Sequence, residues 1–102
     1  MMDYLKEYGL NDEQINNFRN LVINTGNNID IFEVEDDEIK KILDVFVNIG
    51  VTNIYGIMMT NPSLFHDTVS SIKERIDEYG NNEELANLLN KDPNNLSLIG
   101  ML

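Results

Sequence analysis

The chain has 102 residues, of which 42% are hydrophobic and 25% charged, so it is long enough for one core and has the composition of a folded domain. Eighteen acidic residues face seven basic ones, and the formal net charge of -11 opposes binding to DNA, RNA and anionic lipid. The absence of cysteine excludes disulfides, thiolate catalysis and thiolate zinc sites.

The front of the chain predicts two helices. Residues 3–8 form the first, which ends at Gly9, a residue type favoured in the left-handed position after a helix. Asn11 is expected to cap the second helix, with Gln14 completing a capping box. The apolar residues of this second helix share one face, formed by Ile15, Phe18 and Val22.

A polar segment, residues 24–30, then interrupts the helical pattern around Gly26. We expect Ile29, Ile31 and Phe32 to anchor this connection to the core. The acidic run over residues 33–38 places carboxylates at the start of the next helix, where the helix dipole stabilises them. Because this run lacks the spacing and the glycine of an EF-hand loop, no metal site is predicted.

The rest of the chain carries one pattern twice. An apolar helical stripe ends at a glycine, a short apolar run follows, and Asn-Pro or Asp-Pro comes next. Gly50 and Gly80 lie 30 residues apart, and Pro62 and Pro93 lie 31 apart. Repetition at this period indicates stacked helical units. We predict a weak first repeat without proline over residues 3–32, full repeats over 39–65 and 66–96, and an apolar tail over 96–102.

Each full repeat predicts particular helix boundaries. In the first, Thr52 is expected to cap a short helix, and Asn61 and Pro62 to start the longest helix of the chain. In the second, Asn81 or Asn82 is expected to cap another short helix. The apolar faces expected in the core are Ile39, Ile42, Leu43, Phe46 and Ile49; Ile54, Ile57 and Met58; Phe65, Val69, Ile72, Ile76 and Tyr79; and Leu85, Leu88 and Leu89.

These patterns together predict a single all-α domain, a short α-solenoid or helical-repeat bundle of about six to seven short helices. The repeat resembles that of the mitochondrial transcription termination factor (mTERF) family. The resemblance is carried by Ile49, Gly50, Ile54, Ile57, Asn61, Pro62 and Leu64 in one copy, and by Gly80, Leu85, Leu88, Leu89, Pro93 and Leu96 in the other. It implies stacked helical triplets and, in that family, a basic concave face that binds nucleic acid. Seven cations among eighteen acids cannot line such a face, so only the fold carries over.

The chain offers little catalytic chemistry. His66 is the only histidine, and Ser63 and Ser70 bracket it at a spacing that any helix produces. A surface or boundary histidine is the simpler interpretation. No glycine motif for phosphate binding occurs, and no cofactor is predicted.

We therefore expect a non-enzymatic interaction module with a protein partner, and with neither nucleic acid nor membrane as a direct partner. No signal peptide or membrane-spanning segment is recognised, so the expected location is the cytoplasm. The alternative is an acidic decoy that mimics nucleic acid in the groove of a DNA- or RNA-handling protein. Nucleic-acid binding as in the mTERF family is a further alternative, which the net charge disfavours.

The expected structural residues of the repeat are Gly50, Pro62, Gly80 and Pro93, and both glycines are expected to adopt positive φ at helix C-termini. The expected partner contacts are Met59, which lies off the main apolar stripe, and Leu98, Met101 and Leu102 of the tail. We expect the tail to fold back and complete the core. Pairing with another copy or a partner, or continuation into a longer repeat protein, are the alternatives.

Overall fold

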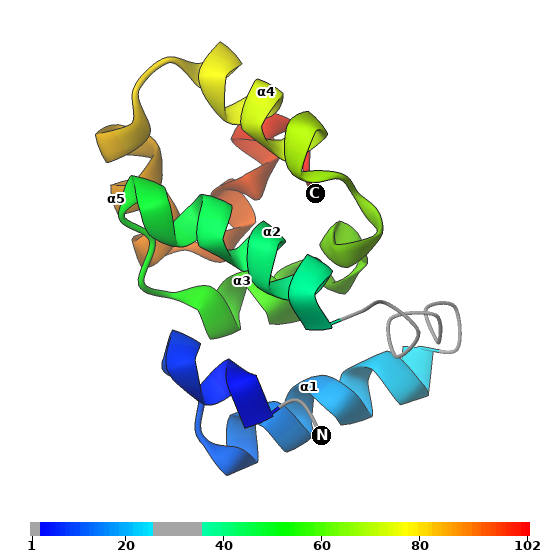
Figure 1. Ribbon diagram of the computed structural model, residues 1–102. Coiled ribbons are helices and arrows are strands. Elements are labelled where there is room, and N and C mark those ends of the chain that lie inside the picture. The colour runs from blue at the N-terminus through cyan, green and yellow to red at the C-terminus, as the bar shows by residue number, and fades with distance from the viewer. Residues whose placement is uncertain (1–2, 26–35) are drawn as a thin grey trace.

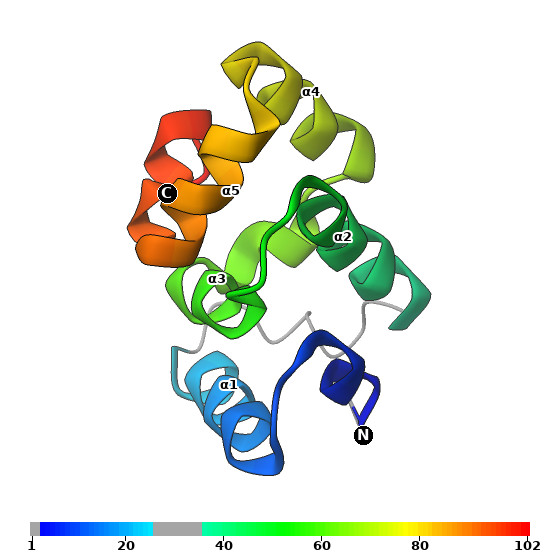
Figure 2. The same ribbon diagram turned by 90° about the vertical axis from the view of Figure 1, so that its left-hand side faces the viewer.

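The computed structural model describes residues 3–25 and 36–102, which form an all-α fold, as predicted. With η denoting a 3-10 helix, the elements are η1 (Asp3–Tyr8), α1 (Asp12–Thr25), α2 (Asp36–Ile49), α3 (Ile54–Thr60), η3 (Pro62–His66), α4 (Val69–Tyr79), α5 (Asn82–Lys91) and η4 (Pro93–Ile99). Figures 1 and 2 show η1 and α1 at one end, α2 and α3 in the middle, and α4 at the other end. The anchoring role expected of Ile29, Ile31 and Phe32 lies outside the described residues.

The elements after α1 form two units of the same kind. The first unit is α2, α3 and η3, and the second unit is α4, α5 and η4. In each, a longer α-helix, a glycine, a shorter α-helix and an Asx-Pro pair precede a 3-10 helix. Gly50 and Gly80 take positive φ values of 108° and 87°, as predicted. Pro62 and Pro93 each occupy the first position of a 3-10 helix.

Three helices end in the same kind of hydrogen-bonded turn. The residue in the left-handed position of these turns is Gly9, Gly50 and Gly100, respectively. The glycine N–H donates to the carbonyl three residues back, and the next N–H donates to the carbonyl five residues back. This is the Schellman arrangement, which an apolar contact across the turn commonly accompanies. The apolar residues that flank the three turns are all buried: Leu5 and Leu10, Phe46 and Val51, and Leu96 and Met101. Each turn therefore returns the chain to the core.

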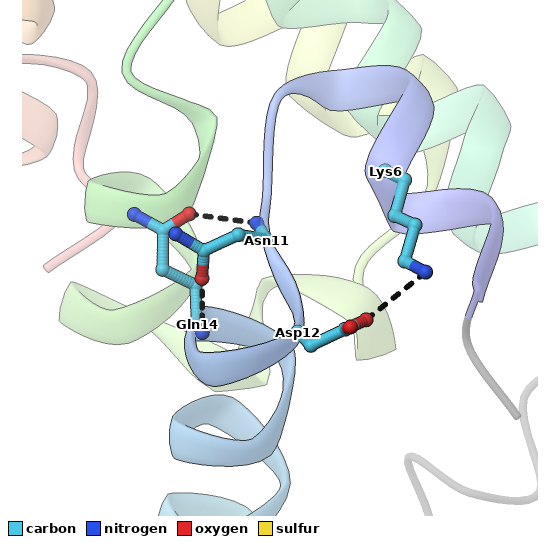
Figure 3. A network of polar contacts seen from close by, with 4 residues as sticks. All are labelled: Lys6, Asn11, Asp12 and Gln14. Carbon is cyan, nitrogen blue, oxygen red and sulfur yellow. Dashed lines mark hydrogen bonds and ion pairs between the residues drawn. The ribbon is translucent and has the colours of Figure 1, made fainter.

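The connection from η1 to α1 contains the predicted capping box (Figure 3). Asn11 Oδ1 accepts from the Gln14 N–H at 2.8 Å, and Gln14 Oε1 accepts from the Asn11 N–H at 3.0 Å. Lys6 pairs with Asp12 across the same turn, at 3.0 Å. Local polar bonds thus fix the angle between the two front helices.

One apolar core runs through the described chain. The rings of Phe18 on α1 and Phe65 on η3 meet edge to face, with centroids 6.0 Å apart. The predicted apolar faces are buried except for four residues that are only partly covered, namely Ile49, Val69, Tyr79 and Leu88. No helix among the described residues is long and apolar enough to cross a membrane.

The predicted cap of the first short helix is wrong by one residue. Asn53 caps α3, because its Oδ1 accepts from the Gly56 N–H at 3.1 Å. Thr52 lies outside the helix, and its N–H, like that of Asn53, donates to Asn90 Oδ1 of α5. The cap is a local bond, and asparagine is a stronger N-cap than threonine, so local chemistry already favours Asn53.

The predicted long helix from Asn61 to Gly80 does not form. η3 and α4 are separate, and extended backbone at Asp67 and Thr68 divides them. Thr68 Oγ1 accepts from the Ser71 N–H at 3.1 Å and so caps α4. The break spans only Asp67 and Thr68, and the apolar residues keep a helical spacing across it. The periodicity of the sequence therefore gave no sign of the break. The longest described helices are α1 and α2, with 14 residues each.

Candidate functional site

The C-terminal segment is a hydrogen-bonded part of the fold. Asp92 Oδ1 accepts from the Asn94 N–H and starts η4, and Gly100 at φ 70° ends it. Arg75 Nη1 of α4 donates to the carbonyls of Ile99 and Gly100, at 3.1 and 3.2 Å. The side-chain amide of Asn61 donates to the carbonyl of Met101. Residues 93–101 are thereby held against both units.

A groove of about 510 Å³ lies where η4 meets α4. It is lined by Arg75, Glu78, Tyr79, Leu98, Ile99 and Gly100. Leu98 is 48% exposed, whereas Ile99 is buried. Burial, and then the carboxylate of Glu84, raises the pKa of Tyr79, so its phenol stays neutral at physiological pH. The groove therefore combines an apolar side chain with one cation, one carboxylate and a neutral phenol.

The predicted contact residues are not gathered in one place. Leu98 lines the groove, and Leu102 is 63% exposed but does not line it. Met101 is 6% exposed, because it closes the turn after Gly100. Met59 is half-buried and packs against the core. Of the four, only Leu98 and Leu102 present large apolar surface.

Sequence reasoning missed the role of Arg75 in this groove. Its guanidinium joins α4 to the turn at Gly100. Hydrogen bonds from a side chain to carbonyls 24 and 25 residues away produce no recognisable local pattern in the sequence. The one available signal was an arginine near the end of the predicted helix, where Glu74, Asp77 and Glu78 make the sequence otherwise acidic.

Gly50 and Pro93 of the repeat also take part in packing between the two units. An ideal Cβ on Gly56 would lie 2.6 Å from Pro93 Cγ, so α3 and η4 approach closely because Gly56 has no side chain. An ideal Cβ on Gly50 would lie 3.5 Å from the Ala86 Cβ of α5. Gly50 and Pro93 thus lie at contacts between the two units, in addition to setting local turns.

The three residues weighed for catalysis, Ser63, His66 and Ser70, are not arranged as a nucleophilic triad. Ser63 Oγ donates to Asn61 Oδ1 at 2.6 Å rather than to His66. Ser63 and His66 lie on η3, Ser70 lies on α4, and all three are exposed. Among the described residues, no group of acids or histidine is placed to hold a metal ion.

The tyrosines of η1 hold it against α2. Tyr8 donates to Asp44 Oδ1 at 2.8 Å, and its hydroxyl also lies 3.3 Å from the Lys40 carbonyl. Burial, followed by the Asp44 carboxylate, raises the pKa of Tyr8 to about 12. The Lys40 ammonium lies 5.4 Å from the centre of the Tyr4 ring, and burial together with Asp36 raises the pKa of Tyr4. Both phenols stay protonated at physiological pH, which suits a structural role.

Comparison with known proteins finds no match: the chain matches no protein-family model, no curated protein and no solved structure.

Proposed function

We propose that this protein is a non-enzymatic helical-repeat module that binds another protein. The observation that carries the proposal is Leu98, which is 48% exposed on an ordered helix beside Arg75 and Tyr79. Tyrosine and arginine are enriched in the cores of protein interfaces, and an exposed leucine in the same groove supplies apolar area. The groove lacks the convergent buried polar groups of a small-molecule site.

The charge of the chain favours a basic partner. A net charge of -11 raises the local concentration of cationic proteins and repels nucleic acid. The proposed location is the cytoplasm, and the resemblance to the mTERF family supports the repeat fold without its nucleic-acid binding.

An acidic decoy of nucleic acid is the second candidate, and the same net charge favours it. A decoy needs carboxylates in a row at the spacing of phosphates. Here many acids lie in the first turns of four separate helices, where each meets its own helix dipole: Asp3; Asp12 and Glu13; Asp36, Asp37 and Glu38; and Glu83 and Glu84. This distribution favours the interaction module over the decoy.

The test is affinity capture of the tagged chain in cells of its source organism, with chemical crosslinking and mass spectrometry. An unrelated helical protein of matched size and charge is the control. We expect one protein to be enriched with the chain over this control. Enrichment of nothing would contradict the proposal, and a captured nucleic-acid enzyme that duplex DNA displaces would favour the decoy.

A further inference from the structure

A second groove, which we call the Tyr8 groove, lies where η1 meets the first unit. It has a volume of about 420 Å³, and its lining includes Glu7, Tyr8, Asp44, Val47, Val51 and Ile54. In Figures 1 and 2 the end of η1 lies beside the segment that joins α2 to α3. The Tyr8 groove shares no lining residue with the groove between η4 and α4.

The lining combines exposed apolar surface with two carboxylates. Val47 is 43% exposed, and it lies three residues after Asp44 on α2, so both side chains are on the same side of the helix. The Tyr8 hydroxyl donates to Asp44 Oδ1 at 2.8 Å, which orients the carboxylate and uses only one of its oxygens. Burial, the bond to Asp44 and the charges of Asp44 and Glu7 raise the pKa of Tyr8, so both carboxylates lie near the neutral phenol.

No basic side chain of the sequence lines the Tyr8 groove. All seven basic residues belong to the described part of the chain, and none is among the lining residues. Those nearest to the two carboxylates in sequence have other contacts: Lys6 lies 3.0 Å from Asp12, Lys41 lies 3.2 Å from Glu38, and the Lys40 ammonium lies 5.4 Å from the centre of the Tyr4 ring. Among the described residues, neither Glu7 nor Asp44 forms an ion pair.

Four other hollows on the described surface differ in this respect. Each contains carboxylates together with at least one basic side chain of the chain itself, namely Lys41 and Lys73, Lys91, Arg75, and Lys73 again. The Tyr8 groove has carboxylates without such a side chain. The positive charge that complements it therefore has to come from outside this sequence.

We infer that the Tyr8 groove binds a lysine or arginine side chain of the protein partner; the inference rests on the proposed function. The aliphatic stem lies on Val47 and on the ring of Tyr8, and the charged end lies between Glu7 and Asp44. Long basic side chains bury their stems on apolar surface in this way while their charge stays in polar surroundings. A purely apolar side chain would leave the carboxylates facing it without a partner, and an acidic one would be repelled.

The test uses the full chain, labelled with ¹⁵N, and Nα-acetyl-lysine methylamide as the probe, with the arginine derivative in parallel. We expect amide shifts around Tyr8, Asp44 and Val47, and a dissociation constant of roughly 1–10 mM, since a single exposed ion pair contributes little. Two further probes separate stem from charge. The norleucine derivative has the stem without the ammonium, methylammonium has the charge without the stem, and each should bind at least about fivefold more weakly.

Variants of the two carboxylates test the site itself. Asp44→Asn keeps an oxygen that can accept from Tyr8, and together with Glu7→Gln it should weaken binding of the lysine derivative by about tenfold. The matched control is the double change Glu83→Gln and Glu84→Gln, which removes the same charge from the first turn of α5 and should leave binding unchanged.

Three results would overturn the inference. The first is equal weakening in the control, because only the net charge would then matter. The second is a set of amide shifts confined to other surfaces, or methylammonium that binds as well as the lysine derivative. The third is self-association in sedimentation that the Glu7→Gln and Asp44→Asn double variant abolishes, because the basic side chain would then belong to a second copy.

The same double variant separates this inference from the proposed function. If the crosslinked partner is captured equally by wild type and by the double variant, the Tyr8 groove is not its site, and the proposed function stands. If no partner is captured at all, the proposed function fails, and the titration with the lysine derivative still decides whether the groove binds basic side chains.

Discussion

At the scale of single residues, Asn90 shows how one amide joins the two units. Its Oδ1 accepts from the N–H groups of Thr52 and Asn53, at 2.8 and 3.2 Å, and its Nδ2 donates to the Gly50 carbonyl at 3.2 Å. We expect Asn90→Ala to destabilise the fold by about 1–2 kcal/mol, since three hydrogen bonds are lost, of which only the one from the Asn53 N–H is half-buried. Urea unfolding measures the change. Asn87→Ala, on the exposed face of the same helix, is the control, and equal losses in both variants would contradict this role.

Tyr8 gives a prediction for the pH dependence of stability. Its pKa is raised from 10.0 in the ordinary case to about 12 in the fold. The neutral phenol therefore stabilises the fold below pH 10, and this contribution is lost as pH rises through about 12. We expect the free energy of unfolding of wild type to exceed that of Tyr8→Phe at about pH 8, with the difference shrinking at high pH. A difference that stays constant across the titration would show that Asp44 does not hold the phenol.

At the scale of elements, the sequence predicted those features that local chemistry determines. The cap at Asn11, the positive φ at Gly80 and the proline starts of η3 and η4 each follow from a short pattern, and each is present. The bonds from Arg75 to the carbonyls of Ile99 and Gly100 were not predictable, because these partners lie far from Arg75 in the chain. The groove was beyond prediction for the same reason, since it forms only when η4 packs on α4.

The break before α4 leads to a prediction about Thr68. Its hydroxyl accepts from the Ser71 N–H at 3.1 Å, which satisfies a donor that the helix itself leaves unpaired. We expect Thr68→Ala to cost about 1 kcal/mol of stability and Thr68→Ser to cost much less. Urea unfolding of the two variants compares them directly. Equal losses would mean that the methyl group, and not the cap, matters at this position.

At the scale of the whole molecule, the excess of acids determines what the surface repels. We expect no binding to random duplex DNA at ~150 mM salt. The negative electrostatic field of the chain repels DNA and so opposes the counterion release that drives such binding. Fluorescence anisotropy tests this, with a basic DNA-binding protein as the positive control. Micromolar affinity would reveal a local basic patch that outweighs the net charge of -11.

The C-terminal segment completes the second unit, and its removal should affect the whole molecule. Ile99 and Met101 are buried, and burial of such side chains contributes about 1.5–3 kcal/mol each as an upper estimate. Deleting residues 97–102 would also leave Arg75 and Asn61 without their carbonyl partners. We therefore expect the melting temperature to fall by roughly 10 °C or more.

A matched variant separates the loss of core packing from the loss of exposed apolar surface. Leu98 and Leu102 are exposed, so the double change Leu98→Glu and Leu102→Glu should leave the melting temperature nearly unchanged. It removes only the exposed apolar surface of the C-terminal segment. A deletion that melts like wild type would contradict the closing role of the segment. A double variant that melts as low as the deletion would show instead that the two leucines are covered in solution, by a second copy or by the chain itself. Sedimentation of the wild-type chain then distinguishes these two cases, because only the first depends on concentration.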